Sequence, residues 1–251
     1  MGAATGAALI FMLGIVGCLV DTVCGQNCSL GKEAWQWQVS IQRNGIHICG
    51  GALISKSWIL SSAGCFSSLG NTSEWRVSLR WTNQTNLNIS RIIRHPSYSL
   101  EISGYDIALV QLNHDISYTN LSIGLPQYSD EVPDGTHCFL SGWEKVDKSM
   151  VLPDLQHLQN VSILGSAACN HFFQSKYVSG ITFIQEDMLC GEDTSNGNCK
   201  GVIGGPLACN IKDKCKLVGI LSWTVGCPHA GLGIYTKTTA FLQWIMSNIS
   251  V

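Results

Sequence analysis

The chain is organised around the stretch Cys199-Lys-Gly-Val-Ile-Gly-Gly-Pro-Leu-Ala-Cys209. Two adjacent glycines, Gly204 and Gly205, precede Pro206 in it. Glycine permits close backbone approach and positive φ, and proline restricts φ, so this order predicts a tight turn. The cysteines at both ends indicate that disulfides staple the turn. We therefore expect a fixed loop here.

The composition is that of a globular protein. The 251 residues could form one large domain or two compact halves, and 45% hydrophobic residues are enough for a core. A net charge of −2 and a pI near 6.4 give no electrostatic footprint for nucleic acid or an anionic membrane. The 26 glycines indicate many turns, as all-β folds need.

The N-terminal segment Ala7–Val20 is apolar and uncharged. It is shorter than the ~20 apolar residues of a comfortable membrane span and is typical of a secretory signal peptide. No Lys or Arg precedes it, and Ile15-Val16-Gly17-Cys18 also resembles a bacterial lipoprotein cleavage box. A short uncleaved anchor is the other alternative. We favour the signal peptide and expect no membrane span.

Cysteine parity bears on the cleavage site. The chain has 12 cysteines, which in a secreted protein indicate disulfides. Cleavage after Gly25 removes Cys18 and Cys24 and leaves an even number, whereas cleavage between these two cysteines leaves one thiol unpaired. Parity therefore favours a signal peptide of residues 1–25 and a mature start at Gln26.

The chain also carries sequons for N-glycosylation, in none of which proline is the middle residue. They are Asn27, Asn71, Asn83, Asn88, Asn120, Asn160 and Asn248. Asn27 is the weakest, because Cys28 within its sequon is expected to form a disulfide. Together with a signal peptide, the sequons predict a secreted, extracellular glycoprotein.

Short alternating runs predict an all-β fold. The strongest signal is a hairpin in which Asn44-Gly45 joins the runs 39–42 and 46–48. The other strand-like runs are 52–54, 58–61, 75–81, 87–93, 107–112, 136–141, 159–164, 206–209, 216–222 and 233–235. Two helices are expected, one at 166–174 capped by Ser166 and one at 238–248 capped by Thr238 or Thr239. The segment Leu125–Gly135 separates two halves of similar size.

Eight motifs, in order along the chain, resemble those of the trypsin/chymotrypsin-like serine protease family. They are Trp37-Gln38-Val39-Ser40, Cys49-Gly50-Gly51-Ala52-Leu53-Ile54, Trp58-Ile59-Leu60-Ser61-Ser62-Ala63-Gly64-Cys65, Asp106-Ile107-Ala108-Leu109, Ser141-Gly142-Trp143, Gly204-Gly205-Pro206-Leu207, Ser222-Trp223 and Gly233-Ile234-Tyr235-Thr236. The resemblance implies one domain over 26–251 with two packed six-stranded β-barrels, about 35–125 and 135–237, and a C-terminal helix at about 238–248.

The resemblance also implies disulfides. The implied pairs are Cys49–Cys65, Cys138–Cys209, Cys169–Cys190 and Cys199–Cys227. Cys28 and Cys215 remain, and parity suggests that they pair. No Cys-x-x-Cys motif or Cys/His cluster indicates a metal, and no cofactor is expected.

At the positions that correspond to the family's catalytic residues, this chain mostly has residues that cannot perform the catalytic steps. A serine protease needs a nucleophilic hydroxyl, an imidazole base and a buried carboxylate that orients the imidazole. The family's Ala-Ala-His-Cys motif corresponds to Ser62-Ala63-Gly64-Cys65, so Gly64 stands at the base position. Ile203 stands at the nucleophile position, and only Asp106 keeps the residue type of the triad. We expect the Asp106 carboxylate to be satisfied by backbone N–H groups and nearby hydroxyls.

The activation switch has changed as well. Family members are cut at a basic-Ile-Val-Gly-Gly junction, and the new N-terminus pairs with the aspartate just before the nucleophile. That aspartate is Val202 here, and the segment Cys28–Ala34 holds no such junction. A buried charge without its partner is costly, so the joint loss is coherent.

The specificity pocket lacks its counter-charge. Gly197 replaces the aspartate that selects Lys or Arg in trypsin-like members, and Thr224 replaces the usual glycine after Ser222-Trp223. Gly233 keeps its expected place. The oxyanion-hole donors would be the backbone N–H groups of Gly201 and Ile203.

These features predict a catalytically inactive homologue that acts as a protein-binding or regulatory module. Its partner would be a protein such as a protease inhibitor or an active protease. Val202 and Ile203 would suit either a contact surface or a core closed over the vacant site. The alternatives are a weakly active or altered serine endopeptidase, and a folded product with little role.

Overall fold

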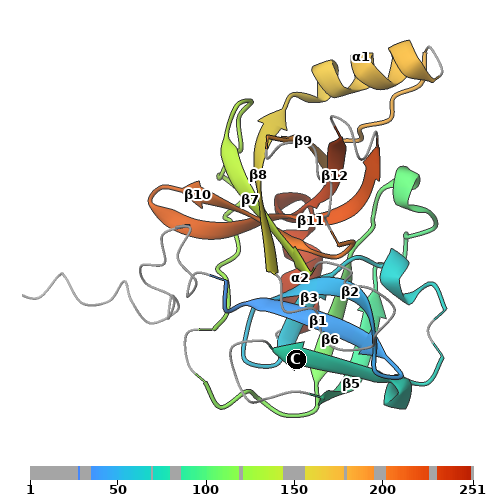
Figure 1. Cartoon of the computed structure of the whole chain (residues 1–251), viewed down its shortest axis with the longest axis vertical. Coiled ribbons are helices and arrows are strands. Elements are labelled where there is room, and N and C mark those ends of the chain that lie inside the picture. Colours follow the sequence, from blue (N-terminus) through green and yellow to red (C-terminus); the bar gives the residue numbers. More distant parts are fainter. Residues whose placement is uncertain are drawn as a thin grey trace, which may run out of the picture.

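The computed structural model describes Cys28 and residues 35–68, 70–79, 86–118, 121–143, 156–177, 180–194, 202–225 and 231–249. Several expectations lie outside these residues: the signal peptide 1–25, the sequons Asn27, Asn83 and Asn120, the pocket position Gly197, the oxyanion position Gly201 and the pair Cys199–Cys227. The described residues form two closed antiparallel barrels, one from each half of the chain (Figure 1).

The first barrel has the strand order β1-β2-β3-β6-β5-β4. Its strands are β1 (Gln38–Arg43), β2 (Ile46–Leu53), β3 (Trp58–Ser61), β4 (Trp75–Leu79), β5 (Leu87–Arg94) and β6 (Ala108–Leu112). Asn44 and Gly45 both have positive φ, 51° and 78°, as the predicted hairpin turn requires. The expected runs 46–48 and 52–54 belong to one strand, β2. Three short 3-10 turns connect the strands: η1 (Gly64–Phe66), η2 (Thr72–Glu74) and η3 (Glu101–Ser103).

The second barrel has the order β10-β11-β12-β9-β8-β7. Its strands are β7 (His137–Trp143), β8 (Gln156–Leu164), β9 (Met188–Asp193), β10 (Pro206–Ile211), β11 (Lys214–Val225) and β12 (Leu232–Lys237). Sequence analysis missed β9, which contains Gly191. A Cβ on Gly191 would lie 2.5 Å from Val161 Cγ1. The glycine that weakens the strand pattern is thus needed for close packing against β8.

The helices α1 (Ser166–Lys176) and α2 (Leu242–Ile249) are present, but both capping predictions are wrong. The carbonyl of Gly165 accepts a hydrogen bond from Cys169 N at 3.1 Å, so α1 starts with Ser166 already inside it. The second helix is preceded by a 3-10 turn, η4 (Thr238–Phe241), whose N-cap is Lys237. Thr238 is fully buried and makes no capping bond.

The two barrels share their packing. The largest hydrophobic cluster contains the interior of the first barrel together with Leu217 and Ile220 of β11 and Phe241 and Ile245 near the C-terminus. The C-terminal helix α2 therefore completes the core of the N-terminal barrel. Ile203, half-buried, contacts both this cluster and the main cluster of the second barrel.

Four disulfides join described cysteines: Cys28–Cys215, Cys49–Cys65, Cys138–Cys209 and Cys169–Cys190. Three of them have the pairing that the family resemblance implies, and the first is the pair that parity suggested. Cys28–Cys215 joins the N-terminal part of the chain to β11 across a sequence separation of 187 residues. Such a bond restrains the unfolded chain and stabilises the fold by ~2–4 kcal/mol.

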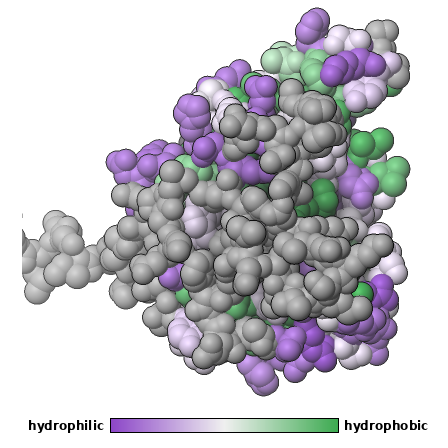
Figure 2. Space-filling view, viewed as in Figure 1, coloured by the Kyte–Doolittle hydropathy of each residue, from purple (hydrophilic) through white to green (hydrophobic). Residues whose placement is uncertain are grey.

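On the face shown in Figure 2, the described surface is mostly hydrophilic, with hydrophobic residues in small separate groups. Of the helices that the structure describes, none is long and apolar enough to cross a membrane. Three sequon asparagines, Asn71, Asn88 and Asn160, are exposed. Asn248 is half-buried, and its Nδ2, the atom that would carry a glycan, donates to Trp244 O at 2.8 Å.

Candidate functional site

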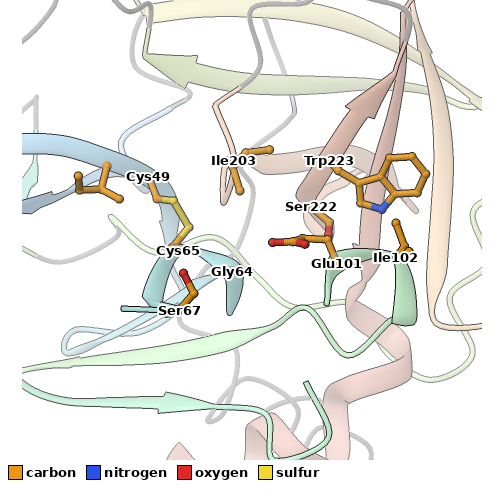
Figure 3. A pocket seen from close by; sticks show the side chains of 10 residues that line it. Cys49, Gly64, Cys65, Ser67, Glu101, Ile102, Ile203, Ser222 and Trp223 are labelled. Atoms are coloured by element: carbon orange, nitrogen blue, oxygen red, sulfur yellow. A yellow bond between two sulfur atoms is a disulfide. The ribbon is translucent and has the colours of Figure 1, made fainter. Parts of the chain in front are cut away.

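A cleft of about 560 Å³ lies where the two barrels face each other. Four large apolar side chains line it: Ile48 and Ile102 from the first half of the chain, and Ile203 and Trp223 from the second. Glu101 is the one charged residue in the described lining, and Gly64, Ser67, Ser222 and the Cys49–Cys65 disulfide complete it (Figure 3). The cleft therefore contains two of the predicted triad positions, Gly64 and Ile203.

Asp106, the third predicted triad position, lies behind Gly64 and Ser222 and is 1% exposed. Its carboxylate accepts hydrogen bonds from Ser62 Oγ at 2.8 Å, from Gly64 N at 2.8 Å and from Ser222 Oγ at 2.5 Å. Its backbone carbonyl accepts from Thr236 Oγ1 at 2.7 Å, which ties it to β12. A backbone N–H and two hydroxyls thus surround the carboxylate, which in an active triad would orient an imidazole.

The pKa of Asp106 reflects two opposed influences. Burial raises the pKa above the ordinary value of an aspartate, because the charged form loses its water. The hydrogen bonds from Ser222, Gly64 and Ser62 oppose this rise, and the negative charge of Glu101 adds to it. The net direction is upward. Asp106 is therefore a satisfied but desolvated carboxylate.

Gly64 does not leave an empty space at the base position. A Cβ built on it would lie 2.8 Å from Glu101 Oε1 and 3.0 Å from Tyr98 Oη. These two side chains are joined, because Tyr98 Oη donates to Glu101 Oε1 at 3.0 Å. Figure 3 shows Glu101 reaching into the cleft on the side of Gly64. A longer side chain at position 64 could enter only if this pair moved.

Glu101 and Tyr98 were missed by sequence analysis. They lie in the segment between β5 and β6, which carries no chemical motif. The only signal is that Glu101 precedes Asp106 in the same connection, and such proximity in sequence does not show which way a side chain points. Burial and the nearby charge of Asp106 raise the pKa of the Tyr98 hydroxyl, so it keeps its proton and donates to Glu101.

The predicted tight turn is present in the described part of Cys199–Cys209. Gly205 N donates to Val202 O at 2.8 Å, and Gly204 has a φ of 81°. A Cβ on Gly204 would lie 2.5 Å from Gly50 O and 2.6 Å from Ser61 Oγ. Both the positive φ and the close approach of β2 therefore require glycine at 204.

Ile203, at the predicted nucleophile position, has a side chain without any reactive atom. Its backbone carbonyl accepts from Gly50 N at 2.9 Å, which joins the turn to β2 of the first barrel. Its side chain contacts the cores of both barrels and also lines the cleft. Sequence analysis left open whether this hydrocarbon forms a surface or a closed core, and it does both.

The described part of the specificity pocket is small. Thr224 and Gly233 line a separate cavity of about 10 Å³, which is room for a single water molecule. A Cβ on Gly233 would lie 2.5 Å from Tyr235 Oη, so the buried Tyr235 fills the space beside this glycine. Ser222, the third described pocket position, uses its hydroxyl on Asp106. No group of three metal-ligating side chains occurs among the residues with described positions.

Comparison with known proteins accounts for this architecture. A family profile described as Trypsin matches residues 22–245. The chain is 33% identical to a tryptase of Mus musculus over an alignment of 236 residues, and the match covers 86% of this chain and 86% of the tryptase. The profile match spans the strands of both barrels and the described residues that line the cleft. The chain therefore belongs to the trypsin-like serine protease family.

Proposed function

We propose that this protein is a catalytically inactive member of its family that acts by binding another protein. The observation that carries the proposal is which side chains lie at the predicted base position. Gly64 supplies no base, and the space beside it holds the Glu101–Tyr98 pair. Acyl transfer needs a group that accepts the proton of the nucleophile as the tetrahedral intermediate forms.

The hydroxyls near the vacant positions support the same proposal. Ser62 Oγ and Ser222 Oγ both donate to Asp106, so their protons are directed at a buried carboxylate and away from the cleft. Ile203 has no heteroatom that could attack a carbonyl. Loss of a nucleophile or a base typically lowers the rate by several orders of magnitude, which leaves binding as the property that the cleft retains.

The similarity to a tryptase favours the alternative, a weakly active or altered serine endopeptidase. Treating the intact secreted glycoprotein with a fluorophosphonate probe separates the two. We expect no covalent labelling, with an active tryptase as the positive control. Labelling at any serine would overturn the proposal of inactivity. Hydrolysis of a peptide library would do the same if this activity co-purified with the protein through two chromatography columns.

We further propose that the protein is secreted and glycosylated. The apolar N-terminal segment, the sequons and the disulfides all support passage through an oxidising compartment. Expression of the full chain in mammalian cells tests this. We expect the protein in the medium, an N-terminus at Gln26 and a mass that falls on treatment with a glycosidase. Retention in the cell with an intact N-terminus would contradict it.

The secreted glycoprotein can also be used to identify the binding partner. Pull-down of the secreted glycoprotein from its native fluid, followed by hydrogen exchange on the complex, maps the contact face. We expect protection of the segments that line the cleft, η3 and the end of β11. Protection confined to surfaces remote from the cleft would show that the protein binds elsewhere.

A further inference from the structure

We propose that Glu101 forms a subsite for a cationic side chain, lysine or arginine, carried by an extended segment of the partner protein. The inference rests on the proposed non-catalytic function, because it assigns a binding role to the space that a catalytic base would fill. The argument uses three properties of the cleft: how the carboxylate is held, which charges surround it and what its walls are made of.

The carboxylate of Glu101 is held in place at the cleft wall. One oxygen, Oε1, accepts from Tyr98 Oη at 3.0 Å and lies next to Gly64. Among the described residues Tyr98 is its hydrogen-bond partner, and no Lys or Arg of the described chain forms an ion pair with it. The second oxygen therefore keeps its capacity to accept a strong bond from an ammonium or guanidinium group.

The surrounding charges favour a cation. No basic residue occurs in the described lining of the cleft. Asp106 lies just behind Gly64, and its carboxylate interacts unfavourably with that of Glu101. The described cation whose charge acts on Tyr98 is Arg94, which lies outside the described lining of the cleft. A positive side chain entering beside Gly64 would meet two carboxylates, whereas an anion would be repelled by both.

The apolar walls strengthen this preference and define the rest of the occupant. Ile48 and Ile102 are 42% and 58% exposed at the rim, and Ile203 and Trp223 line the interior. Filling such a cleft removes water from Glu101, and a neutral occupant would leave that carboxylate desolvated, with the Tyr98 hydroxyl but no positive charge beside it. The suitable occupant is therefore a segment with one basic residue flanked by apolar ones. The cleft volume of about 560 Å³ is within the range of ligand sites.

Two fluorescein-labelled peptides test the subsite on the intact secreted glycoprotein. One is Gly-Ser-Ala-Leu-Arg-Leu-Ala-Ser-Gly, and the other has citrulline, the neutral isostere, in place of arginine. Fluorescence anisotropy should give a dissociation constant about tenfold lower for the arginine peptide, as a charge-assisted bond in a partly enclosed site predicts. Added salt should weaken this preference.

Two protein variants locate the effect. Glu101→Gln keeps an oxygen for Tyr98 and removes the charge, so the preference for arginine should disappear. Glu131→Gln makes the same charge change at an exposed residue outside the cleft lining, and the preference should stay. Equal affinity of wild-type protein for both peptides, absence of binding, or a preference that survives in Glu101→Gln would each overturn the subsite. Cleavage of the arginine peptide would instead contradict the proposed inactivity, and mass spectrometry of the same samples detects it.

Discussion

The two barrels face one cleft but hold their sides of it by different means. The first barrel contributes the polar group of Asp106, Gly64, Glu101 and Tyr98, which hydrogen bonds fix. The second contributes Ile203 and Trp223, which are fixed by packing, Ile203 against both cores and Trp223 against Phe173. The difference teaches that the residue at the predicted nucleophile position, Ile203, is held by the core, whereas the space beside Gly64, at the predicted base position, holds a polar pair.

The turn of the second barrel offers the strongest way to break this arrangement. We expect Gly204→Ala to lower the free energy of unfolding by about 4 kcal/mol, because it combines an unfavourable positive φ with a backbone contact to Gly50. Urea denaturation measures the loss. Gly45→Ala is the matched control, since Gly45 has a φ of 78° with nothing within 4 Å of its Cβ. It should lose about 1 kcal/mol. Equal losses would show that the contact with Gly50 contributes nothing.

On the polar side, we expect Asp106→Ala to lower the unfolding free energy by about 3 kcal/mol. The change leaves Ser62, Ser222 and the N–H of Gly64 without their common acceptor in a buried position. Thermal and urea denaturation check it. Asp106→Asn keeps one acceptor oxygen and should recover part of the loss. If alanine were as stable as the wild type, the carboxylate would not hold this side of the cleft.

Removal of a side chain's contacts should lower the unfolding free energy less on the apolar side of the cleft than on the polar side. We expect Ile203→Ser, which restores the hydroxyl of an active member, to lower the unfolding free energy by about 2 kcal/mol through lost packing against both cores. Ile203→Val, which keeps most of the hydrocarbon, is the control and should lose about 1 kcal/mol or less. A serine variant as stable as the wild type would mean that Ile203 is not part of the core.

The raised pKa of Asp106 predicts a specific pH dependence. Since its pKa is higher in the folded than in the unfolded state, the folded protein retains a proton that the unfolded chain has released. Its contribution to stability therefore falls as pH rises from the unfolded pKa, ~3.9, to the folded one, by ~1.4 kcal/mol for each pKa unit. Unfolding free energies of wild type and Asp106→Asn, compared across this range, isolate the contribution. Parallel curves would contradict it.

The smallest effect is expected from restoring the catalytic residue types. The combined variant Gly64→His, Val202→Asp and Ile203→Ser should gain no peptidase activity. The sequence contains no basic-Ile-Val-Gly-Gly junction that could release an activating N-terminus, and even the Cβ of a side chain at position 64 would lie 2.8 Å from Glu101 Oε1 and 3.0 Å from Tyr98 Oη. Peptide hydrolysis and fluorophosphonate labelling measure the outcome. Robust hydrolysis without an engineered cleavage site would contradict this expectation and show that the residue types at the three positions are enough to decide activity.

Sequence analysis recovered the barrels because their strands have local patterns and collinear motifs. It missed β9 because Gly191 is selected by contact with Val161, a residue distant in sequence. It placed both helix caps wrongly, because Thr238 is drawn into the core and Ser166 lies inside its helix. Capping depends on backbone geometry that residue type alone does not determine.

Part of the candidate site could likewise be predicted from the sequence, and part could not. The positions of Gly64, Asp106 and Ile203 followed from motifs, since motifs align residues with known places in the fold. The role of Glu101 did not, because it depends on the path of the connection that holds η3 and on the space that Gly64 leaves. Tertiary packing decides which distant side chains lie beside a glycine, and this packing has no local sequence signal.

The packing of Phe241 and Ile245 into the first barrel has a consequence for biosynthesis. A chain made from its N-terminus finishes the strands of the first barrel long before it makes the residues that close that barrel's core. During synthesis, part of the apolar interior of the first half therefore stays uncovered until Phe241 and Ile245 have been made, and we expect this half to be prone to aggregation until then. We therefore expect removal of the residues from Phe241 onward to destabilise the barrel formed by the first half of the chain.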